Sequence, residues 1–354
     1  IDWLENLPTS PFNWPDTIST TTTTPTTRTI GLGEDGITIE GSNERGGFSR
    51  AAAKLTVAGV TFYVCALGRE GTKTGVKPGC IVYPGTPDEL FRKKVRTALS
   101  FALGVYLVDL GHTLYDREWR IVLGYARSAY SLGKLAFDMA PEQLAPLGDR
   151  YLYQLDRAEL SRMVNALVAS YDALDLANLS WAYWHARAVT VHIAPAHFGA
   201  AIEALQRAYL AVHPDLVSTT ILDRRQWGEV QSALAATLAA AGLSEDVERT
   251  LVGRLHTLNQ TAQRKILVGV LQATGLQLGA DEDAAWRRRN DAAHGTPIPE
   301  GEALAAIRDM KLLRGLFHRM LLRITGAADS YIDYASVTHP YRPLEQPPAS
   351  QALE

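Results

Sequence analysis

Apolar residues recur with the helical period through the second half of the chain. From about residue 140 the composition shifts toward Ala, Leu, Arg and Glu, and prolines and glycines divide the pattern into short segments. This pattern predicts a helical bundle over residues 141–330, followed by a tail over 331–354 that is loosely held after Tyr341. The expected helices lie near residues 156–175, 178–190, 196–211, 224–241, 244–257, 260–273, 282–294 and 301–325.

The first part of the chain, residues 1–140, shows shorter alternating segments that predict strands and one helix. The expected strands lie at 37–39, 55–57, 60–64, 81–83, 105–110 and 118–125, with a hairpin turn at Ala58-Gly59. Thr86-Pro87-Asp88-Glu89 reads as a capping box, so a helix should follow and stop at Gly104. The expected fold is therefore an α+β N-terminal domain and an all-α bundle, predominantly α overall.

The threonine tract at residues 20–24 is open to two interpretations, because threonine runs occur both in strands and in linkers. The role of the whole region 1–140 is equally open. A sensor for a trigger ligand or protein and a substrate-recruiting domain are the two interpretations.

Length and charge restrict the function. A chain of 354 residues should hold about two domains. Its net charge of −3 excludes a strongly basic nucleic-acid-coating protein, so any RNA binding must come from a local patch. Without a run of 18 apolar residues, no membrane span is indicated. No cluster with metal-ligand spacing is present either, and we expect neither a metal nor a cofactor.

Cys65 and Cys80 are the only cysteines. They form no CxxC motif and suggest no disulfide framework, so we interpret them as buried structural thiols. A reducing, cytoplasmic compartment is the expected location.

The segment from Trp286 to Gly295 is the densest in chemistry, with three arginines, an amide, a carboxylate and a histidine. Acidic residues at 281–283 suit the start of a helix, and Gly295 followed by Pro297 suits its end. The helical period places Arg287, Asn290, Asp291 and His294 on one stripe, where Asn290 and Asp291 can orient the imidazole. Arg289 lies about 140° from His294 around the axis, within reach of the same anion.

These residue types suit a metal-free cleavage of RNA. A guanidinium fork binds two phosphate oxygens, and a histidine accepts the proton of a 2′-hydroxyl or donates one to the leaving 5′-oxygen. The product is a 2′,3′-cyclic phosphate. Because one histidine does not readily serve as base and acid in one step, two chains meeting at this helix are expected. The alternative is a solvated face with surface salt bridges and a capping histidine.

Arg289-Asn290-Asp291-Ala292-Ala293-His294 resembles the R-[polar]-xxx-H signature of HEPN domains, and its place between late helices resembles the ApeA-like branch. The resemblance spans about residues 155–328, but only the motif is specific. It implies a helical bundle that dimerises and a metal-independent endoribonuclease of antiphage, abortive-infection or toxin systems. The resemblance implies that Arg289 binds the phosphate, that His294 transfers the proton and that Asn290 orients the imidazole. Arg287 and Arg288 also satisfy the looser spacing, so which arginine works stays open.

Two further groups bear on function. The helix at 301–325 has a basic face that is either an ordinary wet face or a track for the RNA backbone. His197 and Glu203, on the helix at 196–211, favour core or interface roles over catalysis. The basic face of the helix at 301–325 carries Arg308, Lys311, Arg314 and Arg319, with His318 and Arg323.

The competing functional class is a non-catalytic module. In this interpretation the bundle binds a nucleotide or a partner protein at the same basic site.

Overall fold

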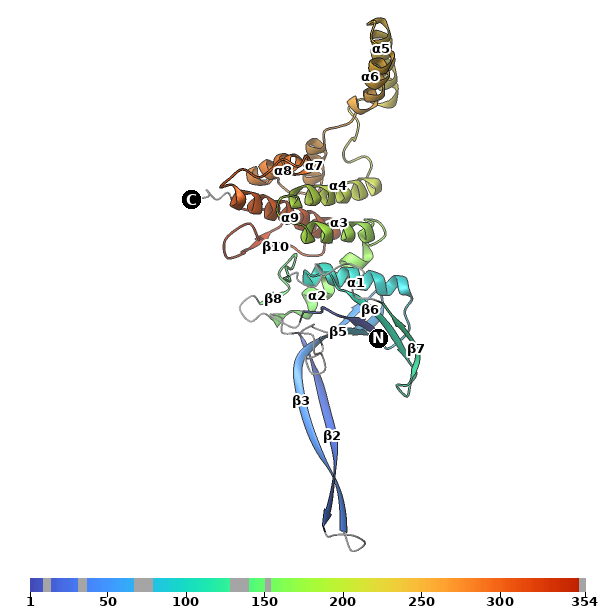
Figure 1. Ribbon diagram of the computed structural model, residues 1–354, viewed down its shortest axis with the longest axis vertical. Coiled ribbons are helices and arrows are strands. Elements are labelled where there is room, and N and C mark those ends of the chain that lie inside the picture. Colours follow the sequence, from blue (N-terminus) through green and yellow to red (C-terminus); the bar gives the residue numbers. More distant parts are fainter. Residues whose placement is uncertain (9–13, 31–36, 67–78, 128–139, 150–153, 350–354) are drawn as a thin grey trace. The chain divides into compact units, whose positions relative to one another are not determined.

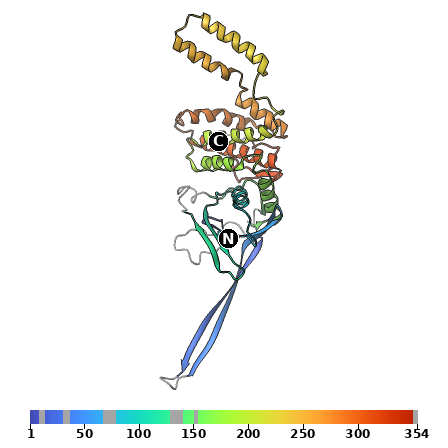
Figure 2. The same cartoon turned by 90° about the vertical axis from the view of Figure 1, so that its right-hand side faces the viewer.

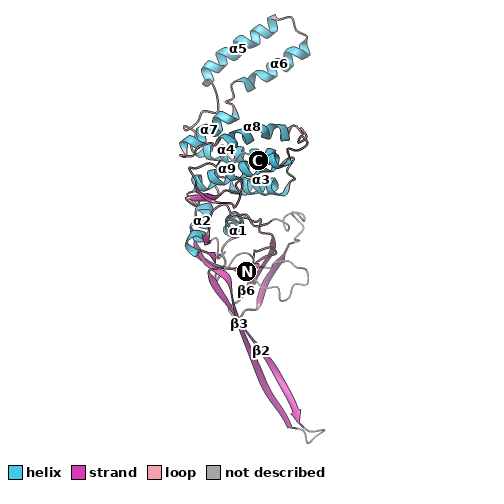
Figure 3. Cartoon of the chain, turned by 90° about the vertical axis from the view of Figure 1, so that its left-hand side faces the viewer, coloured by secondary structure: helices cyan, strands magenta, loops and turns pink. Residues whose placement is uncertain are grey.

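A computed structural model describes residues 1–8, 14–30, 37–66, 79–127, 140–149 and 154–349 (Figure 1). The chain divides into two compact units, Ile1–Ala169 and Ser170–Glu354. The first unit is built on an antiparallel sheet and the second mainly on helices (Figure 3), so the α+β class expected from the sequence is confirmed.

The sheet of the first unit is antiparallel at every pairing, in the order β2-β3-β4-β5-β1-β6-β7 among the described strands. The first strand of the chain thus lies in the interior of the sheet. The strands are β1 (Asp2–Leu4), β2 (Asp16–Ile30), β3 (Ile37–Val57), β4 (Val60–Ala66), β5 (Gly79–Val82), β6 (Asp109–Tyr115) and β7 (Ile121–Ala126), with a separate pair, β8 (Gly148–Asp149) and β9 (Gln154–Leu155).

The threonine tract lies in β2, so the strand interpretation holds for it. Residues Ala52–Val57 of β3 pair with β4, whereas Ile37–Arg50 pair with β2 alone. β2 and β3 therefore continue past the other strands as a two-stranded ribbon (Figure 1). The predicted hairpin turn at Ala58-Gly59 connects β3 to β4, and both residues have positive φ.

Helix α1 (Glu89–Leu103) ends at Gly104, as predicted, but its N-cap is Asp88 rather than Thr86. The Asp88 carboxylate accepts a hydrogen bond from the amide of Phe91 at 2.7 Å. α1 packs on α2 (Arg157–Ala169), and α2 packs on β3. Because α2 makes these contacts, it belongs to the first unit although the sequence placed this helix in the bundle.

The two cysteines lie directly opposite one another in the β4–β5 register. Cys80 is buried and Cys65 is half-buried, and both are free thiols. The two cysteines are fifteen positions apart in the sequence. The sequence indicated buried thiols, but it did not indicate that the two lie opposite one another on neighbouring strands.

The predicted helices of the second unit are present, with ends that differ from the expected positions by a few residues. Helix α9 is its centre: twelve of its residues are buried, and it contacts α4, α8 and β10. α3 and α7 pack on α4. The helices are α3 (Leu176–Ala188), α4 (Ala194–Val212), α5 (Arg224–Ala240), α6 (Glu245–Leu258), α7 (Gln263–Ala273), α8 (Ala280–Ala293) and α9 (Ala303–Thr325).

The tail was expected to be loosely held after Tyr341, and this expectation is wrong for the described residues 342–349. β10 (Ser330–Ile332) pairs with β11 (Tyr341–Pro343), and Leu344 is buried. Arg319 of α9 donates from Nε to the carbonyl of Leu344 at 2.9 Å. This hydrogen bond from a buried arginine side chain to a main-chain carbonyl therefore holds the segment against the bundle.

Candidate functional site on helix α8

Helix α8 begins and ends where the sequence indicated. At its start, the Glu282 carboxylate accepts a hydrogen bond from the amide of Gly279 at 2.9 Å. At its end, His294 is the C-cap residue and Gly295 adopts a left-handed φ of 72°. Trp286 is buried and anchors the middle of the helix to the bundle. The motif residues therefore occupy the last two turns of a helix that is capped at both ends.

Each arginine of the motif forms an ion pair with a carboxylate. Arg287 pairs with Asp283 at 2.8 Å, one turn earlier on the same helix. Arg288 forms two hydrogen bonds, both 2.6 Å, with the carboxylate of Asp309 on α9. Arg289 pairs with Glu203 on α4 at 2.5 Å.

Arg289 differs from its neighbours in burial. Its side chain is 11% exposed, against 64% for Arg287 and 54% for Arg288. Its guanidinium carbon lies 3.5 Å from the centre of the Trp286 ring, and Nη1 donates to the Trp286 carbonyl at 2.8 Å. Stacking, a backbone acceptor and an ion pair thus hold this guanidinium in one place.

Gly199 of α4 makes room for this arrangement. A Cβ atom at this position would lie 2.5 Å from Cδ and 2.7 Å from Nε of Arg289, closer than van der Waals contact allows. The seat of Arg289 therefore consists of Gly199 and Glu203 on α4 and Trp286 on α8. Glu203 was assigned to the core or an interface on sequence alone, and its partner is 86 positions away.

Asn290, Asp291 and His294 are exposed at the end of α8. Within the described residues, the His294 imidazole makes no hydrogen bond, so neither the Asn290 nor the Asp291 side chain is hydrogen-bonded to it. The orientation of the imidazole by these two neighbours is therefore not seen in the single chain. The histidine is accessible to a ligand, and Arg289 is nearly enclosed.

The basic face of α9 is largely internal, contrary to the RNA-track interpretation. Arg314 and Arg319 are buried, so neither is presented to an RNA backbone. Arg319 forms a buried ion pair with Glu282 at 2.7 Å. Arg308 pairs with Asp281 at 2.7 Å and is 12% exposed. Lys311, the remaining residue that was proposed to bind RNA, is half-buried. The amphipathic pattern did not reveal that carboxylates of α8 face this side of α9.

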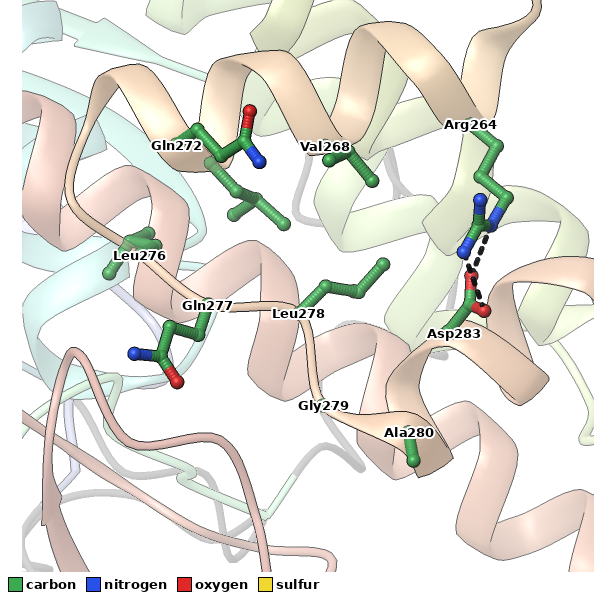
Figure 4. Close-up of a pocket in the computed structure, with 10 residues that line it drawn as sticks. Arg264, Val268, Gln272, Leu276, Gln277, Leu278, Gly279, Ala280 and Asp283 are labelled. Carbon is green, nitrogen blue, oxygen red and sulfur yellow. Dashed lines mark hydrogen bonds and ion pairs between the residues drawn. The ribbon is translucent and has the colours of Figure 1, made fainter.

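A pocket of about 470 Å³ lies between α7 and the start of α8 (Figure 4). Arg264 closes one side through two hydrogen bonds to Asp283, at 2.6 and 2.9 Å. Arg264, followed by Arg287, holds the pKa of Asp283 below its usual value. Leu271, Leu276 and other apolar side chains form the floor. The pocket is at the opposite end of α8 from His294, so it is separate from the motif.

The structure, over the residues it describes, contains no cluster of His, Cys, Asp and Glu that could hold a metal ion. Within the same residues, no helix combines the length and apolar character that crossing a bilayer requires. Comparison with models of known families, with curated proteins and with solved structures finds no match to this chain. The arrangement at α8 must therefore be interpreted from its own geometry.

Proposed function

We propose that this protein is a metal-independent endoribonuclease of HEPN type that uses the end of helix α8 as its catalytic element. The observation that carries the proposal is the contrast between Arg289, which several contacts hold in place, and His294, which is exposed two helical turns from the buried Trp286. A preorganised guanidinium stabilises added charge on a phosphate, and an accessible imidazole transfers protons.

In the proposed reaction, His294 removes the proton from a ribose 2′-hydroxyl. The 2′-oxygen then forms a bond to the adjacent phosphorus, and the bond from phosphorus to the 5′-oxygen breaks. A proton donor returns a proton to the leaving oxygen, so the products are a 2′,3′-cyclic phosphate and a 5′-hydroxyl. Because a single imidazole does not serve both roles in one step, the His294 of a second copy is the proposed acid. The setting implied by the motif is antiphage or abortive-infection defence.

Glu203 sets a condition on this mechanism. The Glu203 carboxylate accepts a hydrogen bond from Nη2 of Arg289, so a phosphate that binds the same guanidinium competes with this carboxylate. A competing anion must displace a short ion pair whose arginine is nearly buried and whose carboxylate is partly exposed. RNA binding is therefore expected to move Glu203 away from Arg289, or to use Arg287 or Arg288, whose pairs are more exposed.

One observation favours a second candidate, a non-catalytic module that binds a nucleotide or a partner protein. All three arginines of the motif already have carboxylate partners, and two of these pairs connect α8 to other helices. Such pairs also occur in helices whose charges serve packing alone. In this case, the motif holds α4, α8 and α9 together, and the exposed residues at the end of α8 form the binding surface.

His294→Ala separates the two candidates most directly. The side chain is exposed and makes no hydrogen bond within the described residues, so its loss should leave the unfolding temperature nearly unchanged. Purified protein is incubated with RNA in EDTA, and the product ends are identified by mass spectrometry. We expect 2′,3′-cyclic phosphates with the wild type and a loss of cleavage of at least about a hundredfold with His294→Ala.

His192→Ala is the matched control, because it also removes an exposed imidazole from the same unit. Arg289→Ala should abolish cleavage as well, with Arg120→Ala as the control for removal of a paired guanidinium elsewhere. If the wild type leaves RNA intact, or if His294→Ala and His192→Ala cleave equally well, the nuclease proposal is wrong and the binding module is favoured.

A further inference from the structure

Two thiols face one another across neighbouring strands of the first unit. Cys65 on β4 lies directly opposite Cys80 on β5, and both are free. Residues that are directly opposite in an antiparallel pair have Cα atoms about 4.5–5.5 Å apart and project their side chains from the same face of the sheet. A hydrogen bond also joins the two thiols. The two cysteines therefore form one dithiol rather than two separate groups.

The dithiol lies on the face of the sheet that is turned away from α1. Cys65 belongs to the alternate positions of β4 that are half-buried, while the positions between them are buried. Trp3 of β1 lies opposite Cys80, so the neighbouring Asp2 projects from the other face. There the carboxylate of Asp2 accepts hydrogen bonds from two arginines of α1, which packs against the sheet (Figures 2 and 3). The dithiol is therefore outside the core that α1 forms with the sheet.

The two thiols differ in accessibility and in acidity. Cys65 is half-buried, whereas Cys80 is 4% exposed. The hydrogen bond between them lowers the pKa of Cys65, and the same bond together with burial raises the pKa of Cys80. The thiolate is the nucleophilic form of cysteine, and an attacking thiol must also be within reach of its target. Cys65 is therefore suited to attack first, and Cys80 to attack the intermediate that results.

We propose that Cys65 and Cys80 are a site of reversible modification, at which the dithiol exchanges with a small disulfide of the glutathione type and closes into an intramolecular disulfide. The Cys65 thiolate forms a bond to one sulfur of the small disulfide, the bond between the two small-molecule sulfurs breaks, and one thiolate leaves. Cys80 then loses its proton to water and attacks the Cys65 sulfur, and the second thiolate leaves. The leaving thiolates take up the two protons that the cysteines released. Two protein thiols are thus oxidised by two electrons, and one small disulfide is reduced to two thiols.

The strand register allows this closure and makes it reversible. A disulfide joins residues whose Cα atoms are about 4.4–6.8 Å apart, a range that includes directly opposite residues of an antiparallel pair. The Cβ atoms of a disulfide, however, are about 3.5–4.5 Å apart, against about 4.5–5.5 Å for opposite residues. The two strands must therefore draw together locally, and the resulting strain makes the bond easier to reduce. Such a bond suits a modification that comes and goes rather than a permanent structural disulfide.

The dithiol belongs to the first unit, whereas α8 belongs to the second, so the proposal is independent of the nuclease function. The compartment expected from the sequence is also compatible with it. Disulfides in reducing compartments are usually transient, and they are catalytic or redox-sensing rather than structural.

Mass spectrometry of the intact chain tests the proposal directly. The reduced wild type is incubated with oxidised glutathione, and its mass is measured without reducing agent. We expect the end product to lack two hydrogens and to carry no glutathione, and its digest to contain a peptide in which Cys65 is linked to Cys80. Reduced glutathione in excess should restore the starting mass.

The single variants Cys80→Ala and Cys65→Ala test the order of attack. Cys80→Ala should stop at the mixed disulfide of Cys65 and gain one glutathione per chain. Cys65→Ala is the matched control, because it keeps only the buried thiol, and it should react at least about tenfold more slowly than Cys80→Ala. In urea the two variants should react at equal rates, since the difference comes from the folded sheet.

The wild-type experiment decides the outcome even if a variant folds poorly. The proposal is overturned if the wild type keeps both thiols in oxidised glutathione, if it gains glutathione without forming the internal disulfide, or if the linkage joins two chains. A disulfide that excess reduced glutathione does not reopen would be a structural bond and would contradict a reversible site. Equal rates for the two folded variants would contradict the role of Cys65 as the attacking thiol.

Discussion

Replacement of Arg319 by methionine tests the role of the buried ion pair beneath the candidate site. Arg319 and Glu282 are both 0% exposed. The guanidinium donates to both carboxylate oxygens at 2.7 and 2.8 Å and to the carbonyls of Gln277 and Leu344 at 2.9 Å. Arg319→Met preserves much of the side-chain volume but removes all of these donors.

The expected loss of stability comes from the Glu282 carboxylate, which remains buried without its partner. A buried carboxylate without its partner destabilises a protein by about 3–5 kcal/mol, which is a large part of a typical free energy of unfolding of about 5–15 kcal/mol. Glu282→Gln in the same chain removes the unpaired charge and keeps an acceptor for the Gly279 amide. The double variant should therefore be more stable than Arg319→Met by at least about 1 kcal/mol.

The pH dependence of the free energy of unfolding gives a second, independent test of the ion pair. Burial raises the pKa of Glu282, whereas Arg319 and the Gly279 amide oppose this shift. Without Arg319 the pKa should rise further, so the folded variant binds a proton more tightly than the unfolded chain does. Stability is then lost as the pH rises from the unfolded value of about 4.3 through the folded pKa. The stability that Arg319→Met loses relative to the wild type should consequently be largest at neutral pH and smaller toward acidic pH.

Urea denaturation followed by far-UV circular dichroism at pH 5 and pH 7.5 measures these effects. Arg323→Met is the control, because Arg323 lies one turn later on α9, is 32% exposed, and pairs with a half-exposed Glu345. Its cost should not exceed about 1 kcal/mol. If Arg319→Met costs no more than this control, or if its cost is the same at both pH values, the pair does not stabilise the bundle as reasoned.

Three other predictions concern single positions. Gly199→Ala should displace Arg289, since its Cβ would lie 2.5 Å from Cδ, and should lower RNA cleavage by about a hundredfold in a kinetic assay. Burial lowers the pKa of His318 well below its usual value, so wild-type stability should fall as the pH drops below about 6.5; His318→Gln should flatten this slope in urea denaturation. A hydrogen bond with Cys80 lowers the pKa of Cys65, so mass spectrometry should find Cys65 alkylated first by iodoacetamide, and Cys80→Ala should slow that reaction.

Local chemistry accounts for the parts of the structure that were predictable. The helical period and the terminal glycines Gly104, Gly295 and Gly326 located the helices to within a few residues, because period and capping depend on residues near in sequence. Strand positions were less accurate. β6 begins at Asp109 rather than at Val105, since strand ends depend on pairing with distant segments.

The candidate site was predictable only in its composition. Sequence alone indicated which residues gather at the end of α8, and the HEPN resemblance of that motif stays a prediction. It did not indicate that Arg289 pairs with Glu203, or that Arg319 pairs with Glu282 in the core.

What the sequence by itself determined was therefore the set of helices, their ends and the polar groups on the last turns of α8. Only the tertiary structure decided which charges are accessible. A guanidinium on an amphipathic helix looks the same in sequence whether water or a carboxylate from another helix surrounds it. The packing of α8 against α4 and α9 enclosed Arg289 and Arg319 and left His294 exposed, because burial of an ionised group requires a partner that only the folded chain supplies.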